Sequence, residues 1–344
     1  MSRILVLGGS GFVGRHLVAR LSAAGHEVLV PTRYRERAKA LLPLPTVEVV
    51  QAELHQPGTL RRLLVGCDAV FNLVGVLHSA RARGAERYGA QFARAHVELP
   101  RQLLQACREA GVHKLLHMSA LGASIDGPSE YLRSKGEAEA LLTAAANDFA
   151  STNDSASTND SASALQLCLF RPSVIYGEDD KFLNLFKNLQ KFLPVLAVGG
   201  AEARFQPVWV EDVAAAMLAA LQAMQAARHS GAQRLAQAQC FDLVGPEVFT
   251  LRQLIRFAGA AAGHARPIIA LPAPLAYLQA WAMEFLPGSP LSRDNLDSMR
   301  VDNVSPAAFP FGIQPAAMAS VASRWLAGES HHGRLDVLRM RAGR

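Results

Sequence analysis

The first half of the chain alternates short apolar runs with longer stretches of helical periodicity. The apolar runs, bounded by polar, glycine or proline residues, predict strands at 3–7, 27–31, 46–50, 69–74, 114–118 and 165–170. The stretches between them that repeat apolar positions every three or four residues predict helices, most clearly at 12–24, 86–110 and 130–146. Because strands that alternate with helices form parallel sheets covered on both faces, we predict an α/β fold with a Rossmann-type doubly wound sheet.

Beyond residue 175 the alternation becomes less regular. We expect further elements at 182–193 (helix), 204–210 (strand), 211–227 (helix), 241–244 (strand) and 251–262 (helix), and an irregular region rich in Pro and Gly at 263–315. The pattern therefore predicts a Rossmann domain formed by 1–175 and 203–245, and a smaller C-terminal substrate or docking lobe formed by 176–202 and 246–330.

Residues 151–163 read STNDSASTNDSAS, a tandem repeat of the hexapeptide STNDSA followed by Ser163. Such a polar segment has no apolar surface to bury and does not offset the entropy that ordering costs. We expect a flexible low-complexity insertion at the surface.

Composition narrows the class of protein. Half of the 344 residues are hydrophobic and 19% are charged, which is typical of a globular protein. A predicted strand at 3–7 leaves no room for a signal peptide, and the most apolar run, 268–286, contains two prolines, so we expect no membrane-spanning helix. The four cysteines lie far apart in apolar surroundings, so we expect buried, reduced thiols, no metal site and a cytoplasmic location.

The net charge of +6 is not gathered in a block of like charges. It therefore gives no support to nucleic-acid binding and fits an anionic cofactor or an anionic membrane surface equally well. The apolar segment 267–290 leaves three alternatives open: the core of the smaller lobe, an interfacial membrane contact, or a docking surface.

A glycine-rich turn follows the first predicted strand. Gly8, Gly11 and Gly14 give G-x-x-G-x-x-G directly before a predicted helix. The glycines permit a tight turn, a close backbone approach to a pyrophosphate and helix packing on the strand, while the helix N-terminus supplies N–H donors. This order of elements predicts a dinucleotide site.

The end of the second predicted strand bears on the cofactor. A site selective for NAD(H) places a carboxylate there for the ribose 2′-hydroxyl. This sequence instead places Arg33 there, with Glu36 too far along the chain, so we expect no carboxylate beside Arg33. A guanidinium is suited to a 2′-phosphate, so the sequence favours NADP(H) and leaves NAD(H) possible.

A second set of residues carries acid/base chemistry. Tyr131 and Lys135 are four residues apart and share one face of a predicted helix, and Ser119 ends the preceding strand. An ammonium about 4 Å from a phenolate is worth roughly 4 kcal/mol at an effective dielectric near 20, or about three pKa units. Tyr131 could then exchange a proton with a carbonyl or alcohol near neutral pH, with Ser119 bonded to the same oxygen.

These motifs resemble the extended or atypical branch of the short-chain dehydrogenase/reductase superfamily. The segments 72–75, 171–177 and 208–214 share this likeness, which covers residues 1 to about 260. Within the branch, the segments 96–98, 113–122, 171–177 with 179–182, and 286–303 are similar to the nucleotide-binding accessory subunits of respiratory complex I (the alpha-subcomplex subunit-nine type) and their bacterial relatives. The resemblance implies a tightly bound NADPH with a structural role.

The resemblance also implies which residues contact the nucleotide: Gly8, Ser10, Gly11, Phe12, Val13, Gly14, Arg33, Glu53, Leu54, Leu73, Val74, Gly75, Tyr131, Lys135 and Pro172. Two positions depart from the family pattern. His96 stands where many of these dehydrogenases have a proton-relay asparagine, and Glu53 replaces the more usual aspartate.

Two functions follow from the sequence. The first is a nucleotide-binding protein related to complex I accessory or assembly subunits, located in the cytoplasm or at the periphery of the inner membrane, with respiratory complex I or the membrane surface as partner. The second is an NAD(P)-dependent oxidoreductase or epimerase that acts on a small hydroxy, keto or sugar-nucleotide substrate, with Tyr131 as acid/base and Ser119 and Lys135 in support. Whether the protein catalyses a reaction at this site or only binds the nucleotide therefore stays open.

Overall fold

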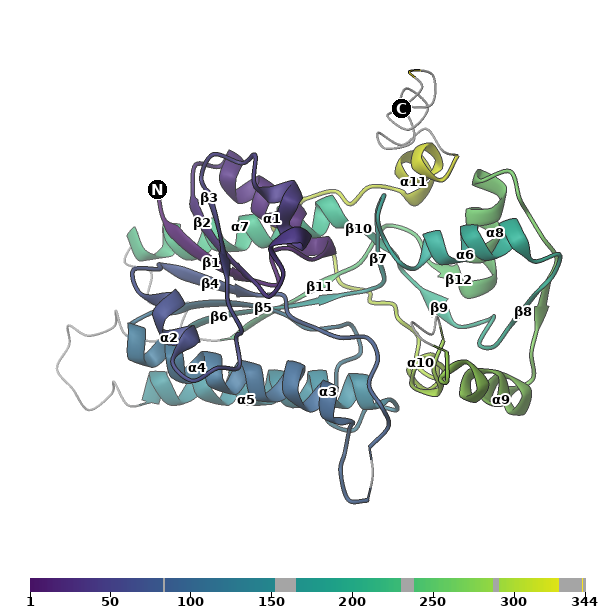
Figure 1. The fold of residues 1–344 in the computed structure, drawn as a ribbon, viewed down its shortest axis with the longest axis horizontal. Helices are drawn as coiled ribbons and strands as arrows, with labels where there is room; N and C mark the ends of the chain where they lie inside the picture. The colour runs from purple at the N-terminus through teal and green to yellow at the C-terminus, as the bar shows by residue number, and fades with distance from the viewer. Residues whose placement is uncertain (83, 152–164, 230–237, 287–290, 328–341, 343–344) are drawn as a thin grey trace. The chain divides into compact units, whose positions relative to one another are not determined.

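The structure, a computed structural model, describes residues 1–82, 84–151, 165–229, 238–286, 291–327 and 342 (Figure 1). The expected insertion at 151–163 lies, from residue 152 on, outside the described residues. The chain divides into two compact units. Unit 1 contains 1–172, 213–243 and 310–313, and unit 2 contains 173–212, 244–309 and the described residues from 314 on.

Unit 1 is built on a seven-stranded parallel sheet in the order β11-β6-β5-β4-β1-β2-β3. Its strands are β1 (Arg3–Leu7), β2 (Glu27–Thr32), β3 (Val47–Gln51), β4 (Ala69–Asn72), β5 (Lys114–Met118), β6 (Gln166–Pro172) and β11 (Gln239–Leu243). In the central strands both faces are covered, and β1 reads as a continuous buried run after Arg3. The predicted α/β fold with a Rossmann-type sheet is confirmed.

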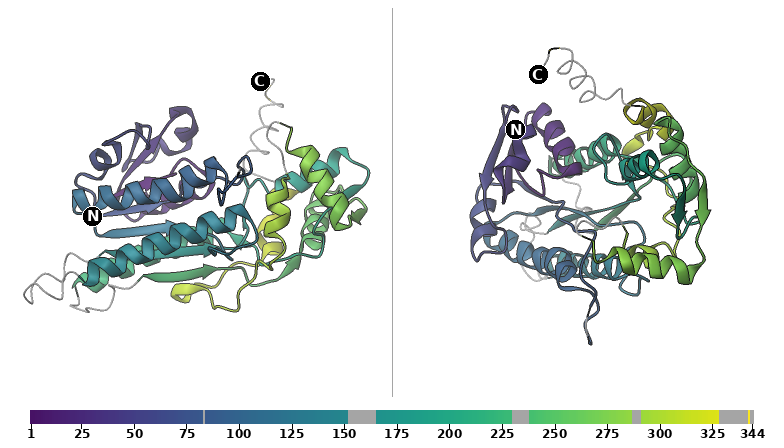
Figure 2. Two further views of the ribbon diagram at one scale, coloured as in Figure 1. Left: turned by 90° about the horizontal axis from the view of Figure 1, so that it is seen from below. Right: turned by 45° about the vertical axis from the view of Figure 1, so that its right-hand side comes forward.

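Helices cover both faces of this sheet (Figure 1). Those of unit 1 are α1 (Phe12–Ala23), α2 (Thr59–Leu64), α3 (Ala90–Phe92), α4 (Leu99–Ala110), α5 (Glu130–Ser151) and most of α7 (Val210–His229), with a 3-10 turn at Arg35–Leu41. Helices α4 and α5 lie side by side over one face (Figure 2). The single helix expected at 86–110 is interrupted, because residues Ala93–Glu98 form a π-helix between α3 and α4.

Unit 2 contains three two-stranded ribbons and five helices among its described residues. The ribbons pair β7 (Ile175–Tyr176) with β10 (Val208–Trp209), β9 (Arg204–Phe205) with β12 (Phe249–Thr250), and β8 (Leu196–Val198) with β13 (Ile268–Ala270). The helices are α6 (Leu183–Phe192), α8 (Leu251–Ala261), α9 (Ala273–Met283), α10 (Arg293–Ser298) and α11 (Met318–Leu326). Its main apolar core joins α6, α8 and α11 around Tyr176.

The observed boundaries differ from those expected at 173–175, 203–212, 244–245 and 310–313. Residues 203–212 fall in unit 2, where the strand expected at 204–210 is split into β9 and β10. Pro207 separates the two, because proline has no N–H to donate to a strand ladder. Residues 310–313 fall in unit 1, where the Phe311 ring lies 4.9 Å from the ring of Phe241 on β11.

Three of the four cysteines are buried as free thiols, but the expected burial is wrong for Cys240. Cys240 is exposed because β11 is an edge strand of the sheet. Of the helices that the structure describes, none combines the length and the apolarity needed to cross a bilayer. Within the same residues, we find no group of three His, Cys, Asp or Glu side chains that could hold a metal ion.

Candidate functional site

The glycine turn after β1 leaves no space for side chains. Gly8 has a φ of +80°, and a Cβ there would lie 3.0 Å from the carbonyl carbon of Leu73. A Cβ on Gly14 would lie 2.3 Å from the Gly8 carbonyl oxygen and 2.6 Å from the Gly9 Cα. These short distances, together with the positive φ of Gly8, exclude a side chain at either position. The backbone of Gly8 therefore packs against that of Leu73, and the backbone of Gly14 packs against that of Gly8 and Gly9. The turn thereby brings the start of α1 close to the ends of β1 and β4.

The N-terminus of α1 keeps its donors available. Gly11 is the N-cap residue, and among the described residues no side chain caps the helix. The first turn contains no acidic residue, while Ser10, Phe12 and Val13 are partly exposed. An uncapped helix start combines free N–H groups with the positive end of the helix dipole, which suits a pyrophosphate. The residues present therefore fit the phosphates of a dinucleotide.

The segment after β4 is fixed by hydrogen bonds from its backbone. Leu73 N–H donates to the Leu7 carbonyl (2.9 Å), Val74 N–H to Asn72 Oδ1 (3.2 Å) and Val76 N–H to His96 Nε2 (3.1 Å). Gly75 lies between two of these contacts, and a Cβ there would be 3.4 Å from Lys135 Nζ. Leu73, Val74 and Gly75 thus lie beside both the glycine turn and α5.

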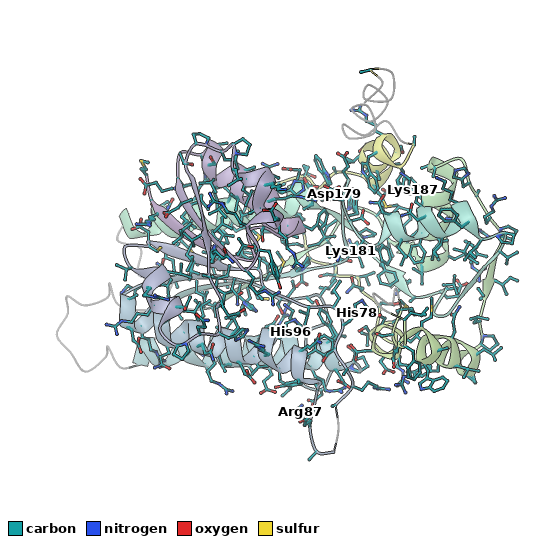
Figure 3. The ribbon with its side chains drawn as sticks, in the orientation of Figure 1. His78, Arg87, His96, Asp179, Lys181 and Lys187 are labelled. Atoms are coloured by element: carbon teal, nitrogen blue, oxygen red, sulfur yellow. The ribbon has the colours of Figure 1, made fainter. Side chains whose placement is uncertain are left out.

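His96 connects this segment to α5. It lies in the π-helix and is 1% exposed (Figure 3). Since its Nε2 accepts from Val76 N–H, its Nδ1 carries the proton and donates to Ser134 Oγ (2.8 Å), and that hydroxyl donates to the Tyr131 carbonyl (2.8 Å). Burial, and then the charge of Lys135, lower the pKa of His96 to about 2. His96 is therefore a neutral link, with both ring nitrogens bonded within the chain.

The predicted Ser119 directly follows β5, and the structure places Lys135 of α5 at this end of the strand. Lys135 is 3% exposed, and its Nζ donates to the Met118 carbonyl at 3.0 Å, next to Ser119. Burial lowers the pKa of Lys135 to about 8, against the opposing attraction of Glu139. Lys135 remains mostly an ammonium at neutral pH. Tyr131 is partly exposed, with its ring 5.6 Å from that of His96.

The Ser119 hydroxyl is buried without a hydrogen-bond partner in the described part of the chain. An unpaired buried hydroxyl is costly and calls for a partner that the described residues do not supply. A substrate or cofactor oxygen would satisfy it.

Two further buried polar residues were not identified from the sequence. His117 on β5 accepts at Nδ1 from Asn72 Nδ2 (3.2 Å), and burial lowers its pKa to about 3. Glu130 accepts from the N–H groups of Ala82 (3.1 Å) and Gly89 (2.8 Å), and so fixes the segment that follows β4 to α5. His117 lies near the end of a strand and Glu130 at the start of a helix. The apolar periodicity of the sequence predicts these elements but does not indicate that either side chain is buried and hydrogen-bonded.

A cavity of about 400 Å³ lies beside the ends of β2 and β3. It is lined by Arg33, Tyr34, Gln51, Ala52, Glu53, Gln56, Thr59 and Arg62. The structure corrects the expectation that Arg33 has no carboxylate near it, because Glu53 lines the same cavity, with Arg94 Nη2 at 4.0 Å from its Oε1. Arg62, a second guanidinium, was not identified because it reads as a surface position of a helix.

The remaining predicted cofactor residues lie elsewhere in unit 1. Leu54 is partly buried and packs against the apolar core under β1 and β4. Pro172 is buried at the end of β6, and its carbonyl accepts from Leu121 N–H at 2.9 Å. The predicted residues thus divide into the glycine turn, the ends of β4, β5 and β6, helix α5, the cavity that contains Arg33 and Glu53, and the apolar core that contains Leu54.

Comparison with known proteins agrees with this geometry. The profile described as the NAD dependent epimerase/dehydratase family matches residues 4–235. The chain is 29% identical over 290 residues to the mitochondrial NADH dehydrogenase [ubiquinone] 1 alpha subcomplex subunit 9 of Arabidopsis thaliana, covering 82% of this chain and 63% of that protein.

It is also 32% identical over 217 residues to the ceramide reductase of Caulobacter vibrioides, covering 63% of this chain and 60% of that protein. Among solved structures, the UDP-glucuronic acid 4-epimerase of Bacillus cereus, in complex with a UDP-sugar analogue and NAD, aligns with a TM-score of 0.61. That alignment covers 87% of this chain and 99% of the epimerase at 16% identity, which shows a shared fold.

Proposed function

The chain belongs to the NAD dependent epimerase/dehydratase family, and from this premise we propose that it binds a nicotinamide dinucleotide, NADP(H) in preference to NAD(H). The resemblance to extended short-chain dehydrogenases and complex I accessory subunits is confirmed by the comparisons. The observation that carries the proposal is the glycine turn, in which backbone-to-backbone packing at Gly8 and Gly14 presents an uncapped helix start. Gly11–Val13 would hold the pyrophosphate, and Tyr131 and Lys135 would hold the nicotinamide ribose.

The preference for NADP(H) rests on the cavity beside β2 and β3. Two guanidinium groups, of Arg33 and Arg62, line it with one carboxylate, of Glu53. The 2′-phosphate of NADP(H) carries close to two negative charges and pairs well with guanidinium groups. The excess of guanidinium groups over carboxylates in the cavity therefore favours NADP(H) over NAD(H), which has a 2′-hydroxyl there.

The proposal is tested by titrating the protein with NADPH and with NADH. Replacing Arg33 by Ala should weaken NADPH binding by about 10- to 100-fold, the range of a charge-assisted hydrogen bond, and leave NADH binding unchanged. Arg35→Ala, an exposed arginine outside the cavity, is the matched control. Equal affinity of the natural protein for both nucleotides, or no effect of Arg33→Ala, would contradict the preference.

We further propose that the nucleotide is a structural ligand of a component of respiratory complex I or of its assembly. The likeness to the Arabidopsis subunit supports this role, although the chain spans only 63% of that protein. A ligand that binds only the folded state stabilises it by about 2.7 kcal/mol at a hundredfold excess over its Kd. We expect NADPH to copurify, to raise the Tm and to stay unoxidised, and tagged protein to capture complex I subunits. The expected cytoplasmic or inner-membrane-peripheral location stays a prediction.

An oxidoreductase or epimerase is the second candidate, favoured by the unpaired Ser119 hydroxyl and the buried ammonium of Lys135. A bound nicotinamide would supply hydride transfer. In this reading Tyr131 exchanges the proton at the substrate oxygen, Ser119 donates a hydrogen bond to that oxygen, and Lys135 stabilises the phenolate. Screening ketones and UDP-sugars for NADPH consumption or epimerisation tests it. Tyr131→Phe should abolish any turnover and retain NADPH binding, and turnover that survives the change would exclude Tyr131 as the acid.

A further inference from the structure

His96, labelled in Figure 3, joins separate segments of unit 1 that border the candidate site. Its Nε2 accepts from Val76 N–H at 3.1 Å, in the segment that follows β4, and its Nδ1 donates to Ser134 Oγ at 2.8 Å on α5. The Ser134 hydroxyl donates in turn to the Tyr131 carbonyl at 2.8 Å. One side chain thereby connects the backbone after β4 with the helix that carries Tyr131 and Lys135.

The His96 ring also packs against two aromatic side chains. It stacks on the Phe92 ring, four residues earlier, with ring centres 5.5 Å apart. It meets the Tyr131 ring edge to face at 5.6 Å, and the rings of Phe92 and Tyr131 are 6.0 Å apart. Aromatic pairs at these distances attract each other in preferred orientations, so the three rings restrict where the Tyr131 ring can lie.

The π-helix Ala93–Glu98 gives His96 its position. Pro100 has no N–H and cannot donate to the His96 carbonyl four residues before it, so the α-helical ladder is interrupted here. The His96 side chain is thereby buried, at 1% exposed. A leucine would fill a core position without the cost of desolvating an imidazole, so the two hydrogen bonds of His96 explain why a histidine stands there.

His96 also keeps the segment after β4 close to Lys135. A Cβ on Gly75 would lie 3.4 Å from Lys135 Nζ and 3.6 Å from His96 Nε2, so the Gly75 backbone passes beside both groups. The start of this segment is fixed separately, because Leu73 N–H donates to the last residue of β1 at 2.9 Å. Loss of the His96 bond would therefore loosen the end of the segment beside α5 and leave its start in place.

We propose that His96 is a positioning residue for the nicotinamide half of the dinucleotide. It holds the end of segment 73–76 and the Tyr131 ring in place, so that this half of the nucleotide meets a preformed surface. The inference rests on the proposed function, in which Tyr131 and Lys135 hold the nicotinamide ribose. The glycine turn and the cavity that contains Arg33 share no residue with the contacts of His96, so the adenosine half should be held independently of it.

The test compares two ligands that differ in the nicotinamide half. NADPH contains both halves, whereas adenosine 2′,5′-bisphosphate contains the adenosine half with its 2′-phosphate and no nicotinamide riboside. His96→Phe keeps an aromatic ring and removes both hydrogen bonds. In calorimetric titrations it should weaken NADPH binding by about tenfold or more and change binding of the bisphosphate by less than about twofold.

Two amide variants separate the two bonds of His96. In His96→Gln the side-chain oxygen reaches the place of Nε2 and can accept from Val76 N–H, so NADPH affinity should return to within about threefold of the natural value. In His96→Asn the shorter amide reaches the place of Nδ1 and can bond only to Ser134, so binding should stay weak. His26→Phe is the matched control, because His26 is also buried but precedes β2, at the opposite edge of the parallel sheet. It should bind both ligands like the natural protein.

Several outcomes would overturn the proposal. Equal weakening of NADPH and bisphosphate binding by His96→Phe would mean that His96 serves only the fold. Unchanged NADPH binding, or a Gln variant that binds no better than the Asn variant, would also exclude the positioning role, and this last contrast decides the question if His96→Phe does not fold. If the natural protein binds no nicotinamide nucleotide, the proposed function fails together with this inference. If it binds NADH and not NADPH, the same variants are compared with NADH and AMP, and the same outcomes apply.

Discussion

Helices α5 and α9 depart from the usual burial pattern in opposite ways. Helix α5 turns charged and polar side chains inward: Glu130, Ser134, Lys135 and Glu139 are each at most 6% exposed. Helix α9 turns alanines inward and leaves Leu278 and Trp281 about half exposed. Buried polar groups and exposed apolar patches are the informative exceptions to burial, whereas ordinary core positions are not. In this protein the first kind of exception lies at the candidate nucleotide site and the second lies on the outer side of α9.

The two helices also differ in how their exceptions are supported. Every buried polar residue of α5 named above is bonded to another part of unit 1, such as Lys135 to Met118 and Glu139 to Arg171. The exposed apolar residues of α9 have no such requirement, since they cost little in the free protein. We therefore expect substitutions on α5 to change stability strongly and substitutions on the outer side of α9 to change it little.

The largest effect is expected from breaking the ion pair on α5. Arg171 Nε donates to Glu139 Oε1 at 2.9 Å, and the Glu139 side chain is buried. Glu139→Ala removes the partner of the Arg171 guanidinium, whose side chain is 35% exposed, and should lower the free energy of unfolding by about 1.5–3 kcal/mol, measured by urea denaturation. Glu109→Ala, which removes a surface pair with Arg61, should cost less than about 0.5 kcal/mol. Equal losses for the two variants would contradict the comparison.

A pH-dependent effect is expected from Lys135. Its pKa is about 8 in the fold and 10.5 when exposed, so between these values the unfolded chain binds more protons. The free energy of unfolding should then rise with pH above pH 8, by up to about 1.4 kcal/mol per pH unit from this group. Lys135→Met lacks the group and should lack this rise. Urea titrations of both proteins from pH 7 to pH 10 measure this difference in the free energy of unfolding. The same pH dependence in both proteins would show that folding does not lower the pKa of Lys135.

The smallest effect is expected on the outer side of α9. Leu278→Gln and Trp281→Gln should each change the free energy of unfolding by no more than about 0.5 kcal/mol, as is usual for surface positions. Ala280→Leu, on the inner side of the same helix, should lower it by about 1–3 kcal/mol because the buried position has no room. A large loss for either outer variant would mean that the outer side of α9 contributes to the fold of unit 2.

Much of the site could be predicted because it is local in sequence. The turn Gly8–Gly14 follows directly from the glycine spacing between a strand and a helix, and the four-residue separation of Tyr131 and Lys135 follows from helical geometry. The strand that precedes Ser119 was likewise predicted from its apolar run. Each of these features depends on a few neighbouring residues.

Contacts between distant segments could not be predicted. The bonds of His96 to Val76 and to Ser134 depend on the π-helix, which the apolar periodicity of 86–110 does not reveal. The meeting of Arg62 and Glu53 with Arg33 depends on the neighbouring ends of β2, β3 and α2. The division of the strand expected at 204–210 depends on two different partners: β9, before Pro207, pairs with β12, and β10, after it, pairs with β7.

The sequence by itself determined the alternation of strands and helices, the glycine turn and the family of the protein, because hydrophobic period and backbone freedom are properties of consecutive residues. The tertiary structure alone decided which buried polar groups find partners and which apolar groups stay exposed. Those outcomes depend on residues brought together by folding, as Lys135 meets the Met118 carbonyl and Trp281 remains outside the core of unit 2.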